Sequence, residues 1–285
     1  MSNVFSSELT ERLSHLHQLI FDASYTCGEL QHTKELFESG HVSEFDLVYR
    51  MMLSTEFYEK SLSRSIENHL YCIHSARIKM IHELLPDGDI ILDLGGANAP
   101  LYRMGYKYNF KKLTLVDLPE DERHELYGNV SLDSEGVEGE VVIHYSDMTN
   151  LAHIPDNSVD FVWSGQSIEH IPAAAGIIMC EEAFRVLKPG GHFCLDTPNR
   201  LITEIHTATV GGGFIHPEHF LEYTPAQLRK ILLDTNFTIQ DEYGICEMPV
   251  TAKTKEFDYK DFIRGNAISR NMDDCYIQYF HCRKL

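Results

Sequence analysis

IILDLGGANAPL, at Ile90–Leu101, is the stretch that decides the fold class of this chain. An apolar run ends at Asp93 and Leu94, and Gly95 and Gly96 follow it directly. Glycine lets a backbone turn sharply and approach a ligand closely. A buried strand that ends in such a turn is typical of the ligand crevice at the carboxyl edge of a parallel sheet. The later glycines of a G-x-G-x-x-G turn are missing, which disfavours a nicotinamide-dependent oxidoreductase.

Short apolar runs alternate with helical segments after this turn. We expect strands at KLTLVDL, EVVIHYSDM, SVDFVWS, GHFCLDT, FTIQDEYGI and CYIQYFHCRKL. The segment GIIMCEEAFRVLKPGG is expected to be mostly helical, and residues 245–273 are expected to be an irregular connection. Strands that alternate with helices predict an α/β fold with a parallel sheet covered on both faces.

Residues 1 to about 85 show helical periodicity and no strand pattern. We assign residues 1–74 to an N-terminal helical subdomain and residues 75–285 to the α/β domain. An insertion into the α/β domain is expected near residues 200–224. The N-terminal helices are expected to cap the α/β domain; formation of a homo-oligomer through them is the alternative.

Composition restricts the class of partner. The 285 residues carry a formal net charge of -19, which disfavours nucleic acid and favours a small or neutral substrate. The seven cysteines form no C-x-x-C pair, so we expect a reducing compartment, no disulfide framework and no zinc cluster. The first residues do not resemble a signal peptide, and no apolar run is long enough to span a bilayer. We therefore expect a cytoplasmic protein.

Acidic residues stand at the ends of the next two predicted strands. Asp117 lies 22 positions after Gly95, where a carboxylate can accept hydrogen bonds from both ribose hydroxyls. Asp147 and Met148 follow the third strand, where an adenine ring could be recognised.

Together with the first turn and the segment RVLKPGG, these residues resemble class I S-adenosylmethionine-dependent methyltransferases of the small-molecule group. The resemblance covers roughly residues 75–245. It implies a Rossmann-like seven-stranded sheet with helices on both faces and an antiparallel last strand. It also implies S-adenosyl-L-methionine as cofactor, with Asp93 and Gly95 beside its methionine part. The family often has glycine where Asn98 stands. The residues that we assign to the cofactor are Asp93, Gly95, Gly96, Asn98, Asp117, Leu118, Asp147, Met148, Ser164 and Gln166.

Methyl transfer to a hydroxyl requires alignment of the acceptor oxygen and removal of its proton. His170 follows the fourth predicted strand, and we expect it to be the general base. Asp196, at the end of the fifth, is expected to orient it. The position of His170 is similar to that of a histidine in sugar O-methyltransferases, which favours a sugar hydroxyl of a glycan or nucleotide sugar as acceptor. The resemblance also implies that the insertion near residues 200–224 binds the acceptor. The residues that we assign to the acceptor are Asn199, His216, His219 and Tyr223.

Three alternatives remain open. The pair Glu169–His170 also resembles the divalent-cation site of ubiquinone-pathway O-methyltransferases, but Gln166 replaces a further glutamate and is a poorer ligand for a hard cation. We therefore expect no metal and, if one binds, Glu169 and His170 as ligands. The second alternative is an O- or N-methyltransferase for a quinone precursor or another secondary metabolite. The third is a cofactor-binding scaffold without catalysis.

We expect Thr224, before Pro225, to be a helix cap.

Overall fold

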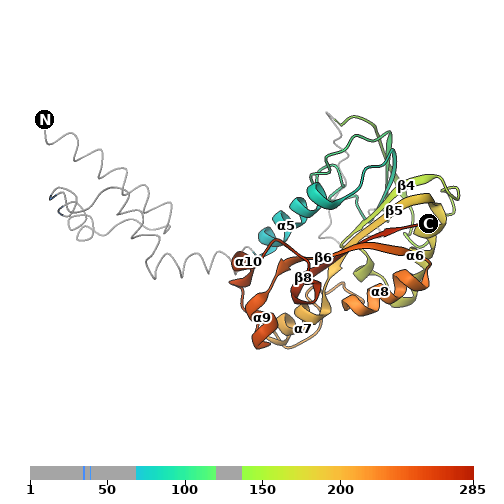
Figure 1. Ribbon diagram of the computed structural model, residues 1–285. Coiled ribbons are helices and arrows are strands. Elements are labelled where there is room, and N and C mark those ends of the chain that lie inside the picture. The colour runs from blue at the N-terminus through green and yellow to red at the C-terminus, as the bar shows by residue number, and fades with distance from the viewer. Residues whose placement is uncertain (1–34, 36–38, 40–68, 120–136) are drawn as a thin grey trace, which may run out of the picture. The chain divides into compact units, whose positions relative to one another are not determined.

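The computed structural model describes residues 35, 39, 69–119 and 137–285 (Figure 1). The chain divides into two compact units, Met1–His69 and Leu70–Leu285. The predicted N-terminal helices before residue 69, and oligomerisation through them, lie outside the described residues. Among those residues, no helix has the length and apolar character that a membrane crossing needs.

A single mixed sheet forms the centre of the described unit. Its eight strands run in the order β3-β2-β1-β4-β5-β8-β6-β7. The strands are β1 (Ile90–Leu94), β2 (Lys112–Asp117), β3 (Glu140–Tyr145), β4 (Val159–Gly165), β5 (Leu187–Pro198), β6 (Thr238–Glu247), β7 (Ile268–Ser269) and β8 (Cys275–Arg283). Strands β1 to β5 are parallel, and β8 pairs antiparallel with both β5 and β6. The expected seven-stranded sheet is confirmed, and the two-residue β7 adds an eighth strand at one edge.

Helices cover both faces of the sheet (Figure 1). They are α5 (His69–Leu84), α6 (Ala173–Val186), α7 (Arg200–Ala208), α8 (Pro225–Asp234), α9 (Pro249–Thr254) and α10 (Asp261–Arg264), with the 3-10 turns η3 (Ile168–His170) and η4 (Met272–Asp274). Helices α5, α7, α9 and α10 supply side chains to one apolar core, and α6 and α8 to the other. Alternation along β1 directs Ile91 into the first core and Leu92 into the second. Thr224 and Gln227 form a capping box at α8, which confirms the predicted cap.

The expectation of an irregular connection at residues 245–273 is wrong. That stretch contains α9, α10, β7 and most of η4. The elements are too short to show a hydrophobic period, and tertiary contacts hold them in place. The buried carboxylate of Asp261 accepts hydrogen bonds from the backbone amides of Val250, at 3.0 Å, and Thr251, at 2.8 Å. A carboxylate at these amides stabilises the first turn of α9.

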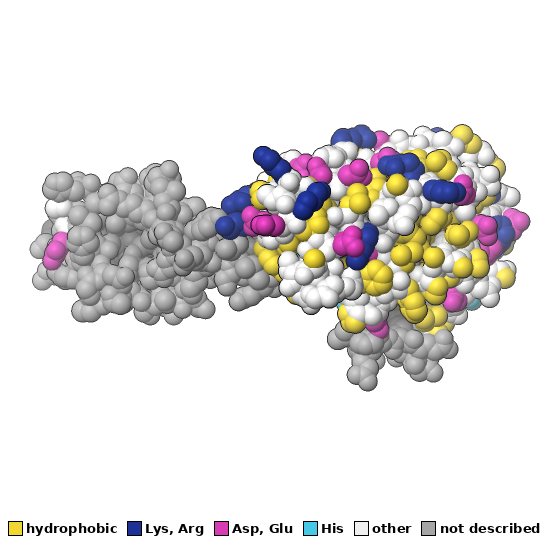
Figure 2. Space-filling view, turned by 90° about the horizontal axis from the view of Figure 1, so that it is seen from below, with side chains coloured by type: hydrophobic (Ala, Val, Ile, Leu, Met, Phe, Trp, Pro, Cys, Tyr) yellow, Lys and Arg dark blue, Asp and Glu magenta, His cyan; other side chains and the backbone are white. Residues whose placement is uncertain are grey.

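Charged side chains of both signs mix on the surface. On the face drawn in Figure 2, Lys and Arg side chains lie beside Asp and Glu side chains rather than in one basic patch. The six cysteines among the described residues are free thiols, and five of them are buried.

Candidate functional site

The predicted crevice lies where the carboxyl ends of the parallel strands meet. Strand β1 sits between β2 and β4, and the chain leaves β1 toward one neighbour and returns to the other later. Ligands of open α/β sheets bind at such a switch point. The turn after β1 is held to β2 by a hydrogen bond of 2.8 Å from the Gly95 amide to the Val116 carbonyl.

Both glycines of the first turn are required by the space around them. Gly95 has a φ of 78°, which disfavours any side chain, and a Cβ there would lie 2.5 Å from the Oγ of Ser167. A Cβ at Gly96 would overlap the carboxyl group of Asp93. The turn therefore packs directly onto Asp93 and Ser167, and its backbone is exposed to the crevice without intervening side chains.

Asp93 is buried beneath this turn, with 1% of its surface exposed. Its Oδ2 accepts a hydrogen bond of 2.8 Å from the backbone amide of Leu101. Burial raises the pKa of Asp93 to about 7, and the nearby charge of Asp117 adds to this shift. A carboxyl group that is close to half-ionised at neutral pH responds strongly to any cation that enters the crevice.

Asp117 and Asp147 organise the loops at the ends of β2 and β3. The two oxygens of Asp117 accept hydrogen bonds from the backbone amides of Ala97, at 3.0 Å, and Leu118, at 2.8 Å. Each carboxylate oxygen can accept a second hydrogen bond, so Asp117 can still bind hydroxyl groups. The Oδ1 of Asp147 accepts from the amide and hydroxyl of Thr149, at 2.8 and 2.7 Å. Asp147 therefore caps a turn and also faces the crevice.

These residues surround a cavity of ≈ 420 Å³, a volume within the usual range of small-molecule sites. Nine of the ten residues predicted for the cofactor line it: Asp93, Gly95, Gly96, Asn98, Asp117, Leu118, Asp147, Met148 and Gln166. The tenth, Ser164, is fully buried in β4 and does not line the cavity. Carboxylates, which are able to bind hydroxyl and ammonium groups, line the cavity together with Leu118 and Met148. This set fits a cofactor that joins an amino acid, a ribose and a flat base.

Asp196 takes part in an ion pair that sequence reasoning missed. Arg77 of α5 donates to both of its oxygens: Nη2 to Oδ1 at 3.0 Å, and Nε to Oδ2. Gln166 donates to Oδ2 from a distance of 3.2 Å and has a φ of 55°, in the left-handed region. Asp196 is fully buried and does not line the cavity, whereas Arg77 does. Asp196 was expected to orient His170, but in the structure it pairs with Arg77 instead.

His170 lines the same cavity as the glycine turn, and Glu218 and Phe220 are also in its lining. Burial, together with the nearby His219 and His216, lowers the pKa of His170 to about 4. The imidazole is therefore neutral at pH 7 and able to accept a proton. The backbone amide of Phe220 donates to the carbonyl of Glu169 at 2.8 Å, and this bond holds the 214–222 loop against η3.

Three histidines meet at this point. The ring centroid of His170 lies 4.8 Å from that of His219 and 5.8 Å from that of His216. One ligand nitrogen from each ring lies within 4.8 Å of the others. The structure thus brings together His170, His216 and His219, which the sequence analysis had divided between base and acceptor site.

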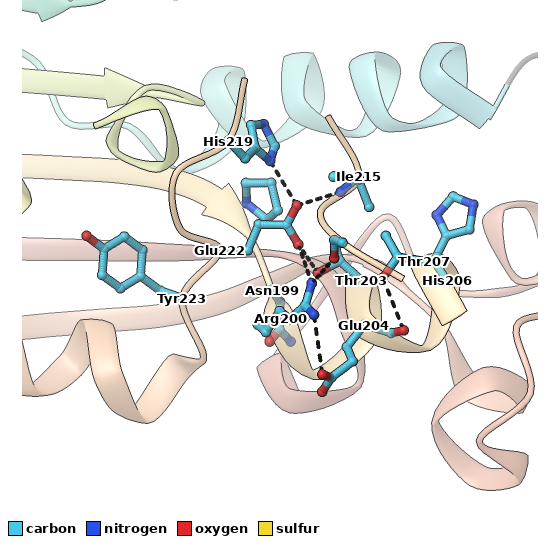
Figure 3. Close-up of polar contacts among 12 residues, drawn as sticks. Asn199, Arg200, Thr203, Glu204, His206, Thr207, Ile215, His219, Glu222 and Tyr223 are labelled. Carbon is cyan, nitrogen blue, oxygen red and sulfur yellow. Dashed lines mark hydrogen bonds and ion pairs between the residues drawn. The ribbon is translucent and has the colours of Figure 1, made fainter. Parts of the chain in front are cut away.

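Glu222, which sequence reasoning also missed, fixes the loop that carries two of these histidines (Figure 3). Its Oε1 pairs with Nδ1 of His219 and accepts from the amide of Ile215, each at 2.8 Å. Its Oε2 accepts from the hydroxyl of Thr203 and lies 3.4 Å from Nη1 of Arg200. Burial would raise the pKa of Glu222, but these hydrogen bonds lower it below its usual value.

Two predicted acceptor residues have structural positions instead. The amide nitrogen of Asn199 donates to the carbonyls of Met272 and Cys275, at 3.1 and 2.9 Å, and its Oδ1 caps α7. Tyr223 is 1% exposed and packs in the core beside α6 and α8. Neither side chain lines the cavity. Both predictions are therefore corrected.

Comparisons with known proteins agree with this geometry. Residues 92–195 match the methyltransferase domain family. A Mycolicibacterium smegmatis protein described as a "probable S-adenosylmethionine-dependent methyltransferase" is 38% identical over 98 residues, 34% of this chain and 36% of that protein. A ubiquinone biosynthesis O-methyltransferase of Psychrobacter arcticus is 30% identical over 38% of this chain and 47% of that protein. The matches thus span between a third and a half of these relatives.

The fold has counterparts among solved structures. A SAM-dependent methyltransferase from Thermotoga maritima superposes with a TM-score of 0.54 and 14% identity, over 79% of this chain and 97% of that chain. At this identity the likeness concerns the fold alone.

Proposed function

We propose that this chain, whose residues 92–195 match the methyltransferase domain family, is an active class I S-adenosylmethionine-dependent O-methyltransferase of a small hydroxylated acceptor. The observation that carries the proposal is a single cavity shared by the cofactor residues and His170. Bound S-adenosylmethionine supplies an electrophilic methyl group on a sulfonium sulfur. Residues of one cavity can align an acceptor oxygen with that group, and alignment contributes much of the rate of such displacements.

The cofactor residues have separate tasks in this proposal. Asp117 accepts hydrogen bonds from the ribose hydroxyls, since each carboxylate oxygen can accept more than one. Asp93 attracts the ammonium group of the methionine part. Asp147 and Met148 border the adenine. Arg77 holds Asp196 and Gln166 in place at the floor of the site, because the guanidinium group contacts the carboxylate from inside the cavity wall.

His170 accepts the proton of the acceptor hydroxyl as its oxygen is methylated. The ring is neutral over the physiological range because its pKa is lowered to about 4. A base of such low pKa is weaker than one matched to neutral pH, so we place its contribution near the lower end of the usual range of about 10²–10⁴-fold.

The acceptor that we favour is a sugar hydroxyl on a glycan or nucleotide sugar. Glu218 and His170 line the cavity, and His216 and His219 stand beside His170. These groups can exchange several hydrogen bonds with a hydroxyl-rich molecule. The competing acceptor is a phenol of a quinone precursor. Trp163 and Phe220 line the cavity and could pack against an aromatic ring, and the Psychrobacter relative is named for ubiquinone biosynthesis.

Methyl transfer from radiolabelled S-adenosylmethionine to two acceptor panels tests the proposal. One panel contains nucleotide sugars and oligosaccharides, and the other contains catechols and polyprenyl phenols. We expect label in the sugar panel, and its loss in His170→Ala. Label in the phenol panel alone would contradict the sugar acceptor and support the phenol of a quinone precursor. Cofactor binding without transfer to either panel would favour a scaffold.

A further inference from the structure

We propose that His170, His216 and His219 form a binding site for one divalent transition-metal ion of the zinc type, at the place where His170 lines the cavity. The three residues belong to two segments, η3 and the 214–222 loop. The inference deepens the proposed function and rests on it only for the role of the ion. The existence of the site depends on the three side chains alone.

The separation of the three rings suits a shared ion. Zn–N bonds of about 2.0–2.1 Å in a tetrahedral site place ligand nitrogens about 3.3 Å apart. The ligand nitrogens here lie within 4.8 Å of one another, so rotations of the side chains can close the gap. The ring planes of His170 and His219 meet at 87°, and those of His170 and His216 at 66°. The rings can therefore point at one centre from different directions instead of stacking.

Glu222 supports His219 in the way that metal-bound histidines are usually supported. Its carboxylate pairs with Nδ1 of His219 at 2.8 Å, which leaves Nε2 as the ligand nitrogen (Figure 3). A carboxylate in this position fixes the orientation of the ring and increases its basicity as a ligand. Glu222 is itself held by Ile215, Thr203 and Arg200, so the arrangement is present before any ion binds.

A weak hydrogen bond of His216 has to break or rearrange when the ion binds. Its Nδ1 accepts a hydrogen bond of 3.3 Å from the backbone amide of Glu218. This bond is long, so its loss costs little when Nδ1 becomes a ligand or when the proton moves to Nδ1 and Nε2 binds instead.

The ligand set selects the class of metal and differs from the Glu169–His170 pair expected from sequence. Imidazole nitrogens suit zinc, copper, iron and nickel, whereas magnesium and calcium require oxygen ligands. The Glu169 carboxyl is fully buried, and its Oε2 accepts from the Thr197 hydroxyl at 2.8 Å. It is not one of the three grouped ligands. Its Oε1 is buried without a hydrogen-bond partner, and a nearby cation would offset part of that cost.

Three protein ligands leave one coordination position open, as in catalytic zinc sites. Because His170 lines the cavity, that position is available to an oxygen atom of the acceptor. Coordination makes a hydroxyl group more acidic. In the loaded protein, His170 would be a ligand and not the base. The coordinated hydroxyl would release its proton to water, and its oxygen would take the methyl group as the carbon–sulfur bond breaks and its electron pair returns to sulfur.

The test uses the full chain after removal of metals with a chelator. Calorimetry with ZnCl₂ should show one site, and CoCl₂ should give the visible absorption bands of tetrahedral cobalt. His216→Ala and His219→Ala should each lower zinc affinity by at least about tenfold. Glu222→Gln should lower it by about 10–100-fold at unchanged stoichiometry. His82→Ala, which removes an exposed histidine of α5, should leave binding unchanged.

Each sample is also titrated with S-adenosylhomocysteine, which shows that the variants are folded. No zinc binding by the wild type, or equal binding by His216→Ala, His219→Ala and the wild type, would overturn the metal site. Either result would leave cofactor binding untouched. Zinc binding without any binding of S-adenosylhomocysteine would instead contradict the proposed function.

Discussion

At the scale of single residues, we expect Asp93 to make the affinity for the cofactor depend on pH. With a pKa raised to about 7 by burial, it is mostly protonated at pH 6 and mostly ionised at pH 8. The ammonium group of S-adenosylhomocysteine stays charged over this range and favours the ionised carboxylate. We therefore expect affinity to rise by several-fold from pH 6 to pH 8 and then to level off.

Calorimetry in buffers of increasing pH measures this dependence. Asp93→Asn keeps an oxygen for the amide of Leu101 but cannot ionise, so its affinity should stay flat over the same range. A wild-type affinity independent of pH would show that Asp93 does not respond to the bound ammonium group.

Replacement of His170 should change turnover but not the affinity for the cofactor. His170→Ala should lower turnover by about 10²-fold or more, because the acceptor hydroxyl loses the group that activates it. The affinity for S-adenosylhomocysteine should change by less than about threefold, because the first turn, Asp117 and Asp147 are unaltered. Turnover is followed as release of S-adenosylhomocysteine with an acceptor identified in the panels, and His82→Ala is the matched control. Full turnover in His170→Ala would show that another group activates the acceptor hydroxyl.

Residues close to strand ends could be predicted, and those brought in from a distance could not. Nine of the ten residues assigned to the cofactor line one cavity because they lie at or shortly after the ends of parallel strands. Arg77 was missed because its partner Asp196 lies 119 positions away. A signal was nevertheless present: Arg77 shares a helix face with Met80 and Ile81, and a charge on an apolar stripe needs a buried partner. Asn199 was assigned to the acceptor because nothing nearby in sequence shows that Met272 of η4 and Cys275 of β8 supply the carbonyls for its amide.

At the scale of elements, a buried ion pair joins helix α5 to strand β5. The side chain of Arg77 is 12% exposed and that of Asp196 is fully buried. Arg77→Met should lower the free energy of unfolding by about 3–5 kcal/mol, because it leaves a buried carboxylate unpaired. Urea unfolding measures the change.

Two further variants define this prediction. Arg77→Met combined with Asp196→Asn should regain much of the loss, since the uncompensated charge is gone. Arg264→Met removes a surface pair with Asp258 and should cost less than about 1 kcal/mol. Equal losses in Arg77→Met and Arg264→Met would contradict the account of α5.

Long elements were predicted well and short ones were not. The strands β1 to β6 and β8 each carry an apolar run that is visible in the sequence. The six residues of α9 and the four of α10 are too few for a periodic pattern, and Asp261 stabilises α9 through tertiary contacts. The 214–222 loop, which carries two of the clustered histidines, likewise depends on the buried Glu222 rather than on a local pattern.

At the scale of the whole molecule, charge restricts the acceptor. The chain carries 43 acidic and 24 basic residues, and the face in Figure 2 mixes both signs. A polyanion such as nucleic acid would be repelled by the net charge of -19. A neutral glycan or a single nucleotide sugar would meet much less repulsion, which agrees with the acceptor that we favour.

Calorimetric titration of the full chain with S-adenosylhomocysteine, beside NAD, tests the central claim most directly. We expect one S-adenosylhomocysteine per chain with micromolar affinity, no binding of NAD, and at least tenfold weaker binding in Asp117→Ala. Binding of NAD alone, or no binding of either ligand with and without added zinc, would contradict the assignment of the cavity to S-adenosylmethionine.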